Sequence, residues 1–403
     1  MEWKEVTLGE ISSKIGDGLH GTPKYDDEGP YYFINGNNLN CGKIIIKDDT
    51  KRVGEDEFVK NQKELNEQTI LVSINGTIGN VAKYNNELCI LGKSACYINV
   101  IKEVDKEFIY YVLTSANFKR NITNEATGTT IKNVSLKQMR EYKFNIPCNI
   151  SDQRCIASIL SSLDQKIELN NKINADLEEM AQAIFKNWFV DFEPFKDGKF
   201  VDSELGMIPG GWKVGTLGDF CKCLLGGTPS RSKEEYWNGD VNWINSGEIN
   251  KFRILEASEK ITELGLSKSA TKLLPKKTTV LAITGATLGQ VSLLEIDTCA
   301  NQSVIGVLEN TEIPYEYIYP FIKDRIEMLI QHQTGGAQQH INKDNVESLI
   351  FLLPAKNVLE NYISLVGPMY KRIESQCFEN LYLSTLRDTL LPRLMSGELE
   401  VPE

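Results

Sequence analysis

The chain has 403 residues, 41% of them apolar and 25% charged, which is ordinary for soluble globular proteins and long enough for two or three domains. Its net charge of −11 disfavours a protein that simply coats nucleic acid, although local basic patches remain compatible with it. No apolar run reaches the roughly 18 residues of a membrane span, and the N-terminus lacks a signal peptide's apolar core, so we expect a cytoplasmic protein.

Residues 1–150 are predicted to form a mixed α/β domain. Short strand-like runs are separated by Gly, Asn and Pro, at 31–36, 43–46, 69–74 and 96–101. One helix is expected from Lys106 to Lys119, where four apolar side chains share a face. The nine cysteines of the whole chain are scattered and odd in number, which favours free, mostly buried thiols over a disulfide framework.

Residues 151–192 are predicted to form one long helix, because residues 152–192 contain neither proline nor glycine. Apolar residues recur there by threes, fours and sevens, the spacing of a coiled-coil seam: Leu160, Leu163, Ile167, Leu177, Ala181, Ile184 and Trp188. Two positions in that register, Asn170 and Asn174, are polar. A helix of about 38 residues would be about 57 Å long, more than one globular domain needs.

After a Gly-, Pro- and acid-rich linker at 193–211, the chain repeats itself. The matching segments keep their order at a period near 207: residues 3–9 with 212–218, 21–23 with 227–229, 33–35 with 243–245, 74–81 with 283–291, and 131–133 with 341–343. Such a series indicates an internal duplication. Residues 212–355 are therefore a second α/β domain, and 356–398 a second long helix.

The two helices are predicted to pair antiparallel about a centre near Lys172 and Phe378. In that register Asn170 faces Asn380 and Asn174 faces Gln376, forming a buried amide layer that fixes register at some cost in stability. Leu163 falls opposite Arg387, a layer with no explanation in the sequence. The alternative is that each helix packs only on its own domain.

Two equal halves joined through such a pair imply a pseudo-two-fold axis and domains at opposite ends, at most about 55 Å apart. One turn of DNA is about 34–36 Å, so such domains suit two half-sites on opposite strands. Because the halves differ in sequence, the half-sites should differ.

Several motifs that resemble catalytic or cofactor sites fail on inspection. Residues 16–21 spell GxGxxG, but Thr-Pro follows where a dinucleotide site needs a helix. Gly92-Lys93-Ser94 lacks the first glycine of a P-loop, and Cys221-Lys222-Cys223 has one spacer residue rather than the two of a zinc pair. The histidines lie in no HExxH motif, and there is no Asn/Asp-Pro-Pro-aromatic loop of an amino-methyltransferase. We expect no catalysis and no metal in this chain.

Three glycine-punctuated polar loops survive in each half: a first loop at 21–25 and 227–231, a second at 73–77 and 284–287, and a third at 128–133 and 335–343. Glycine allows close approach to a ligand, and Thr, Asn, Gln, Lys and Arg hydrogen-bond base edges and phosphates. In the first half the candidate DNA-binding residues are Thr22, Lys24, Asn35, Asn37, Asn75, Thr77, Thr129, Thr130, Lys132 and Asn133. In the second half they are Thr228, Ser230, Arg231, Asn245, Ser246, Thr284, Thr287, Gln338, Gln339, His340, Asn342 and Lys343. The alternative is that these loops are tight turns closed by small polar residues.

With these residues assembled, the chain resembles the specificity subunit of type I restriction–modification systems, HsdS. The resemblance spans the chain and is carried chiefly by 169–195, 203–219, 273–293 and 386–399. It implies two target recognition domains and two conserved helices in an antiparallel coiled coil. It further implies that helices 153–191 and 359–396 dock two modification subunits, which bring S-adenosylmethionine and methylate adenine N6. Restriction subunits, using ATP and Mg²⁺, would join the same complex on double-stranded DNA.

Large apolar residues near the helix ends, among them Phe185, Trp188, Phe189, Leu391 and Met395, could serve either the seam or those partners. Two other hypotheses stay open at this point. One is a self-contained modification or nuclease subunit, which the missing methyltransferase loop disfavours. The other is a coiled-coil scaffold that touches no nucleic acid.

Overall fold

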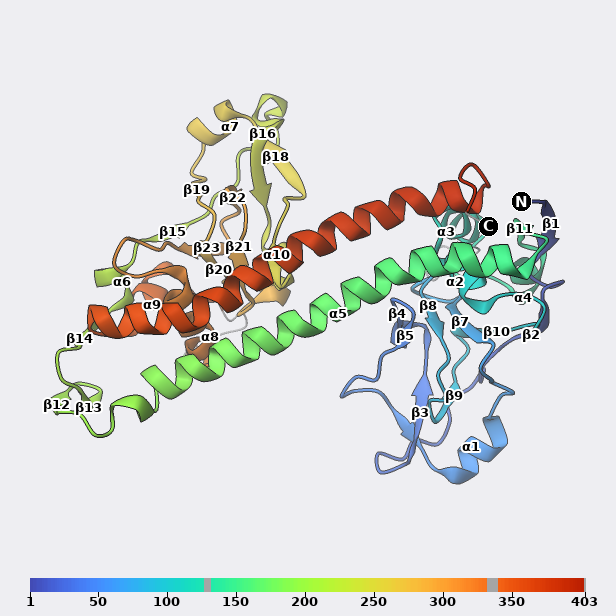
Figure 1. The fold of residues 1–403 in the computed structure, drawn as a ribbon, viewed down its shortest axis with the longest axis horizontal. Helices are drawn as coiled ribbons and strands as arrows, with labels where there is room; N and C mark the ends of the chain where they lie inside the picture. Colours follow the sequence, from blue (N-terminus) through green and yellow to red (C-terminus); the bar gives the residue numbers. More distant parts are fainter. Residues whose placement is uncertain (127–131, 332–339, 402–403) are drawn as a thin grey trace. The chain divides into compact units, whose positions relative to one another are not determined.

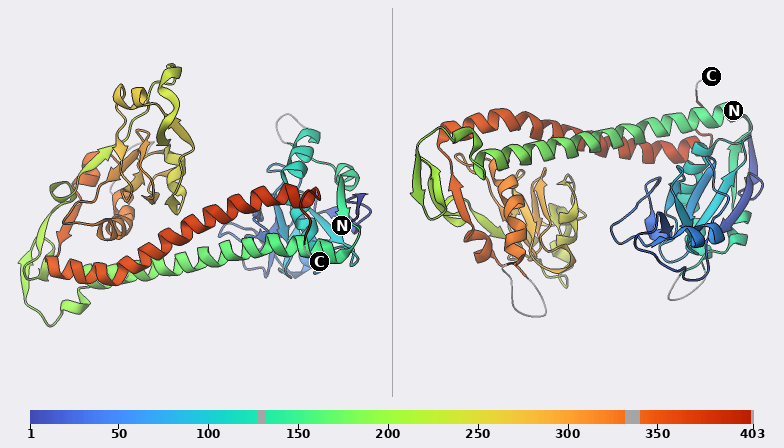
Figure 2. Two further views of the ribbon diagram at one scale, coloured as in Figure 1. Left: turned by 45° about the horizontal axis from the view of Figure 1, so that its top comes forward. Right: turned by 90° about the horizontal axis from the view of Figure 1, so that it is seen from below.

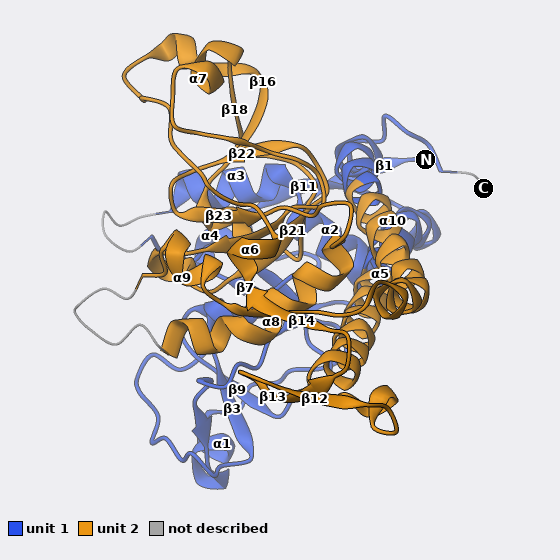
Figure 3. Cartoon of the chain, turned by 90° about the vertical axis from the view of Figure 1, so that its left-hand side faces the viewer, with its two compact units in different colours: residues 1–167, 382–403 blue, residues 168–381 orange. Residues whose placement is uncertain are grey.

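The structure, a computed structural model, describes residues 1–126, 132–331 and 340–401. They divide into two compact units, Met1–Ile167 with Tyr382–Glu403 and Glu168–Leu381, hereafter unit 1 and unit 2 (Figure 3). Two forty-residue helices, α5 (Ile150–Phe189) and α10 (Lys356–Met395), each contribute to both units (Figure 1). No helix among the described residues is long and apolar enough to cross a membrane.

Unit 1 is built on an antiparallel sheet of order β2-β10-β7-β8, with a smaller sheet β6-β3-β9 and the pairs β1-β11 and β4-β5. Its strands are β1 (Trp3–Thr7), β2 (Ser12–Asp17), β3 (Tyr31–Ile34), β4 (Leu39–Asn40), β5 (Lys43–Ile44), β6 (Arg52–Val53), β7 (Thr69–Ser73), β8 (Val81–Lys83), β9 (Cys89–Leu91), β10 (Ala95–Val100) and β11 (Lys143–Pro147). Its short helices are η1 (Gly36–Asn38), α1 (Glu55–Asn61), α2 (Lys106–Thr114), α3 (Ala116–Glu125) and α4 (Leu136–Glu141).

Unit 2 has a five-stranded sheet of order β15-β23-β20-β21-β17, a four-stranded sheet β18-β16-β22-β19 and the pairs β12-β13 and β14-β24. Its strands are β12 (Phe200–Ser203), β13 (Gly206–Pro209), β14 (Lys213–Thr216), β15 (Cys223–Leu225), β16 (Trp237–Ile244), β17 (Arg253–Ile254), β18 (Glu259–Ile261), β19 (Leu273–Leu274), β20 (Thr279–Ala282), β21 (Val291–Leu294), β22 (Thr298–Ala300), β23 (Val304–Val307) and β24 (Ile350–Leu353). Its helices, besides α5 and α10, are η2 (Glu193–Phe195), α6 (Leu217–Phe220), η3 (Glu234–Tyr236), η4 (Ser246–Asn250), α7 (Glu263–Ser267), η5 (Gly285–Thr287), α8 (Tyr315–Gln331) and α9 (Lys343–Glu347).

The duplication seen in the sequence is also a duplication of topology. In unit 1, β10 pairs with both β2 and β7, β3 runs parallel to β9, and β1 pairs with β11. In unit 2, β23 pairs with β15 and β20, β16 runs parallel to β22, and β14 pairs with β24. A long helix follows the last strand in both cases. The mixed α/β fold class, present twice, is therefore confirmed.

The helix pair runs antiparallel within each unit, where α5 and α10 lie side by side (Figure 2). In unit 2 the Asn170 Nδ2 atom donates to Asn380 Oδ1 at 2.8 Å, and Gln376 Nε2 donates to Asn170 Oδ1 at 3.1 Å. Asn174 donates not to Gln376 but to the Cys377 sulfur, at 3.6 Å. All of these except Asn380 are buried, so a polar layer lies inside an otherwise apolar seam.

An ion pair explains why Arg387 stands opposite Leu163 in the helix pair. In unit 1, Arg387 Nη1 lies 2.7 Å from Asp164 Oδ1, and the same carboxylate accepts the Tyr111 hydroxyl at 2.7 Å. The guanidinium is therefore paired across the seam one residue beyond Leu163, and it ties the helix pair to α2.

The aromatic residues at the end of α5 belong to the core of unit 2. Phe189 packs edge-to-face on Tyr317 and Tyr362, with ring centroids 4.8 Å apart in both cases, and Trp188 contacts Phe195. Phe185 and Phe189 are buried. Leu391 and Met395 pack against the core of unit 1.

Two local expectations needed correction. The single helix expected at 106–119 is wrong: Ser115 is extended, its hydroxyl accepts from the Phe118 amide, and the chain forms α2 and α3 instead. Segment 193–211, read as a linker, contains the β12–β13 hairpin.

The expectation of free thiols is confirmed for all nine cysteines, and six of them are buried. Burial raises the pKa of Cys89, Cys221 and Cys223 to about 12.

Candidate nucleic-acid interface

In unit 1 the candidate loops leave the main sheet at one end. Asp17, the last residue of β2, pairs with Cys96, and Ser73, the last residue of β7, pairs with Ala95, so both strands end where β10 begins. The smaller sheet ends at the same place, since Ile34 and Leu91 pair and the Ser94 hydroxyl donates to Asn35 Oδ1 at 3.0 Å. Loops that are far apart in the sequence therefore lie together at one end of the strands.

Unit 2 repeats this convergence. Leu225 of β15 pairs with Ile305, and Ala282 of β20 pairs with Val304, so these strands too end where β23 begins. Ile244 of β16 pairs with Ala300 just before that point, which brings Asn245 and Ser246 beside the loops. The Thr228 hydroxyl donates to Gln302 in the turn that leads into β23.

The second and third loops of each half are joined through the backbone. In unit 1 the Val134 amide donates to the Ile74 carbonyl at 2.9 Å, and in unit 2 the Ile341 amide donates to Ile283 at 3.0 Å. Unit 1 adds a side-chain bond, from Asn75 Nδ2 to Asn133 Oδ1 at 3.0 Å. The described residues at the end of the third loop are thus held against the second loop in both halves.

Two glycines in and just after the second loop have left-handed backbone in both halves. Gly76 and Gly285 have φ of +75° and +73°, and Gly79 and Gly289 have φ of +87° and +82°. Left-handed backbone favours glycine, which explains why these positions are glycine in both copies. Among the residues that the structure describes, none comes within 4 Å of a Cβ built on Gly76 or Gly285.

The candidate residues differ in exposure. Ten are exposed: Thr22, Lys24, Asn37, Thr77, Lys132, Thr228, Ser230, Arg231, His340 and Asn342. Eight are half-buried: Asn35, Asn75, Asn133, Asn245, Ser246, Thr284, Thr287 and Lys343. Thr129, Thr130, Gln338 and Gln339 lie outside the described residues.

Some candidates already have structural roles. Asn245 and Asn342 cap η4 and α9, accepting from the Gly247 and Asn345 amides at 2.8 Å each. Lys343 pairs with Glu347 at 2.9 Å. The alternative of turns closed by polar residues therefore holds for part of the set, including Thr228, whereas Thr22, Lys24 and Thr77 present exposed polar groups from the loops.

Sequence reasoning missed two features of this region. The turns that precede β10 and β23 contribute Ser94 and Gln302, and residues 92–94 drew notice only as a failed P-loop. The second feature is a buried ionic cluster behind the loops of unit 2. Glu178 of α5 accepts from Arg253 Nη2 at 2.6 Å, from the Tyr319 hydroxyl at 2.6 Å and from Lys323 at 2.7 Å.

The carboxylate of Glu178 stays charged despite its position. Burial alone would raise its pKa, but the opposite charges of Arg253 and Lys323 and the hydrogen bonds lower the pKa below its ordinary value. Arg253 is buried and lies in β17, the strand beside β21, which follows the second loop. The cluster therefore fastens α5 to the sheet that carries the loops of unit 2.

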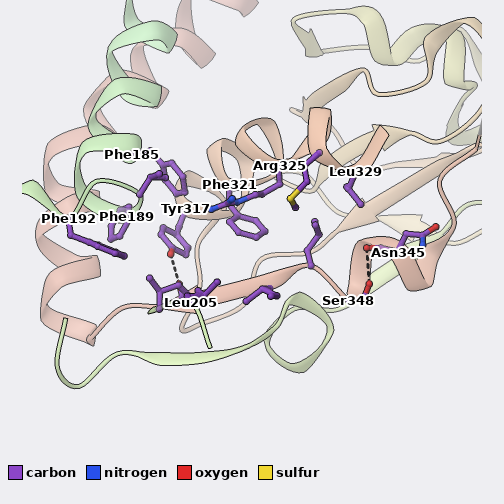
Figure 4. A pocket seen from close by; sticks show the side chains of 15 residues that line it. Phe185, Phe189, Phe192, Leu205, Tyr317, Phe321, Arg325, Leu329, Asn345 and Ser348 are labelled. Carbon is purple, nitrogen blue, oxygen red and sulfur yellow. Dashed lines mark hydrogen bonds between the residues drawn. The ribbon is translucent and has the colours of Figure 1, made fainter. Parts of the chain in front are cut away.

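A cavity of about 510 Å³ in unit 2 was tested as an alternative site (Figure 4). Aromatic and aliphatic side chains line it, including Phe185, Phe189, Tyr317 and Phe321, together with Arg325. Its described lining includes no His, Cys, Asp or Glu. Across the described ranges, no group of three or more such residues could hold a metal ion.

Comparison with known proteins assigns the duplicated fold. The sequence profile of the type I restriction modification DNA specificity domain matches residues 1–179 and 209–361. The MjaIX specificity subunit of Methanocaldococcus jannaschii, a type I restriction enzyme, is 27% identical over 391 residues, covering 95% of this chain and 87% of the relative. The HindI specificity subunit of Haemophilus influenzae is 24% identical over 468 residues, covering 99% and 100%. The crystal structure of a type I S subunit from M. genitalium superimposes with a TM-score of 0.60 at 19% identity, covering 100% and 96%, and supports the fold.

Proposed function

The chain belongs to the type I restriction modification DNA specificity family, and we propose that it reads the two halves of a bipartite DNA target for a type I restriction–modification complex. One observation carries the proposal for this chain. The first and second polar loops, with left-handed glycines at matching positions of the second, occur twice at the corresponding end of two duplicated sheets. Each unit then reads one half-site through base edges and positions itself through phosphates.

We further propose that this chain is non-catalytic and that the helix pair formed by α5 and α10 docks two modification subunits, which are adenine-N6 methyltransferases. Restriction subunits join the same complex on double-stranded DNA. S-adenosylmethionine, ATP and Mg²⁺ belong to those partners. The aromatic residues of α5 that face the seam or the core already pack against other residues of unit 2. The docking surface therefore consists of the outward faces of the two helices. Exposed residues there include Leu169, Met180 and Tyr382.

Exchange of one recognition domain tests the proposal. Residues 212–355 are replaced by the same region of a related subunit, and methylated adenines are mapped across the host genome. We expect one half of the methylated motif to change and the other to stay. An unchanged motif would favour a scaffold that touches no nucleic acid, and methyl transfer by the purified chain alone would contradict a non-catalytic subunit.

A further inference from the structure

Arg231, in the first loop of unit 2, lies over the ring of Trp237 and near that of Trp243, whose rings contact each other edge-to-face. Its guanidinium carbon lies 3.6 Å from the ring centroid of Trp237 and 5.2 Å from that of Trp243. The indole nitrogens fix the loop itself, since Trp237 donates to the Ser230 carbonyl at 3.2 Å and Trp243 to the Gly227 carbonyl at 3.1 Å. Stacking on Trp237 restrains the guanidinium plane before any ligand arrives.

The end of this guanidinium is occupied by a carboxylate. Nη1 donates to Glu259 Oε2 and Nη2 donates to Oε1 at 2.9 Å, a two-bond contact from β18. The pair faces solvent, because the Arg231 side chain is 56% exposed and that of Glu259 35%. These hydrogen bonds raise the pKa of Arg231 and lower that of Glu259, so both groups are charged at neutral pH.

Glu259 uses the same donors that nucleic acid would use. Two adjacent N–H groups of an arginine bind either the oxygens of a phosphate or the O6 and N7 of a guanine. An exposed ion pair is screened by water and salt, whereas a bidentate contact to a base edge contributes to discrimination between bases. The carboxylate is therefore displaceable, while the tryptophan support stays in place.

The first half has no such arrangement at the corresponding loop. Gly21-Thr22-Pro23 is followed by Lys24, which is exposed, and Tyr25 contacts the Phe33 ring with centroids 6.0 Å apart. The lysine has a flexible stem and a compact charge, which suits a phosphate but carries no planar fork. Of these two loops, the one in the second half therefore carries an arginine that is already paired with a carboxylate, and the one in the first half carries a lysine.

We propose that Glu259 masks the Arg231 fork in the free chain and that a pair of hydrogen-bond acceptors on DNA, phosphate oxygens or a guanine edge, displaces it. The inference rests on the proposed function in DNA reading. It makes Arg231 a contact residue of the second recognition domain and Glu259 its competitor. Removal of the Glu259 charge should therefore strengthen DNA binding rather than weaken it.

The test measures binding of the full-length chain to two fluorescent duplexes, one of A·T pairs only and one of G·C pairs, over a series of salt concentrations. Three variants are compared with the wild type: Glu259→Gln, the matched control Glu256→Gln at an exposed carboxylate of unit 2, and the double variant Arg231→Gln/Glu259→Gln. We expect Glu259→Gln to bind about threefold to tenfold more tightly at 0.1 M salt. The double variant should lose this gain, and Glu256→Gln should show little of it.

The two duplexes separate the sources of the acceptors. A gain on both, with the slope of log K against log[salt] steeper by about 0.9, identifies a phosphate. A gain confined to the G·C duplex identifies guanine. An equal gain in Glu256→Gln, or a gain that survives loss of Arg231, overturns the masking. If the folded wild type and all variants leave both duplexes unbound, the proposed function itself fails.

Discussion

The two units share one topology but are fastened to the helix pair by different chemistry. In unit 2 a buried carboxylate, Glu178, meets two cations and a tyrosine, and Glu374 of α10 pairs with Lys276 at 2.7 Å and Lys277 at 3.1 Å. In unit 1 the attachment is the partly exposed Asp164, with Arg387 and Tyr111. Burial decides how much each contact contributes, because exposed pairs contribute little and broken buried pairs cost much.

The first loops of the two units also differ, and again unit 2 has the more extensive ionic and aromatic contacts. Unit 1 presents Lys24, whereas unit 2 presents Arg231 already restrained by Trp237 and Glu259. Duplication therefore preserved the strands and the left-handed glycines, while ionic and aromatic contacts diverged around them. Under the proposed function, such separate changes would let one scaffold read two different half-sites.

The largest expected effect is loss of the Glu178 carboxylate. Glu178→Ala leaves Arg253 buried without its partner, and we expect unit 2 to lose about 3–5 kcal/mol of stability. Urea unfolding followed by tryptophan fluorescence measures this, because four of the five tryptophans (Trp188, Trp212, Trp237 and Trp243) lie in unit 2. The exposed neighbour Glu179→Ala is the matched control. Equal midpoints for the two variants would contradict a role for the buried cluster.

The same cluster should make unit 2 sensitive to acid. The folded-state pKa of Glu178 is lowered, so its contribution is present above the unfolded-state pKa of about 4.3 and is lost as the pH falls through the folded value. The stability difference between the wild type and Glu178→Gln should therefore narrow below about pH 4. Unfolding midpoints at pH 7 and at pH 3.5 measure it, and a difference that widens in acid would contradict the assignment.

Each half-site should depend on the second loop of its own unit. Thr77→Val and Thr287→Val remove one hydroxyl each from matching loops, at about 1–3 kcal/mol per lost base contact. Methylation mapping of cells carrying either variant should show one relaxed half-site, and a different one for each variant. Equal damage to both half-sites in either variant would indicate misfolding, which thermal unfolding of the purified chain would reveal.

The sequence was sufficient for the repeat, for four strands of unit 1 (β3, β5, β7 and β10) and for the polar positions of the seam, because these follow from periodicity and local residue type. It was insufficient where a contact joins distant residues. Nothing local marks Glu178 as the partner of Arg253, 75 positions away, or Asp164 as the partner of Arg387. The break at Ser115 was also missed, since apolar spacing continues across a residue that caps a new helix.

The candidate interface was likewise only partly predictable from the sequence. Glycine and polar residue types identified the loops, but their convergence depends on the pairing of β10 and β23 with strands from elsewhere in the chain. Arg231 was predicted as a DNA contact from its residue type alone. Its guanidinium is paired because Glu259 lies beside it. That residue stands 28 positions later, on a strand that folds back beside the loop.

The smallest expected effect is in unit 1. Arg387→Met removes one cation, but Asp164 keeps the Tyr111 hydroxyl and a 31% exposed side chain that water can reach. We therefore expect a loss of about 1 kcal/mol or less, measured by hydrogen exchange of the β10 and α2 amides. Arg393→Met, which breaks the exposed pair with Glu398, is the control on the same helix. A loss as large as that of Glu178→Ala would mean that both units are fastened equally, and the difference between them would then lie in the loops alone.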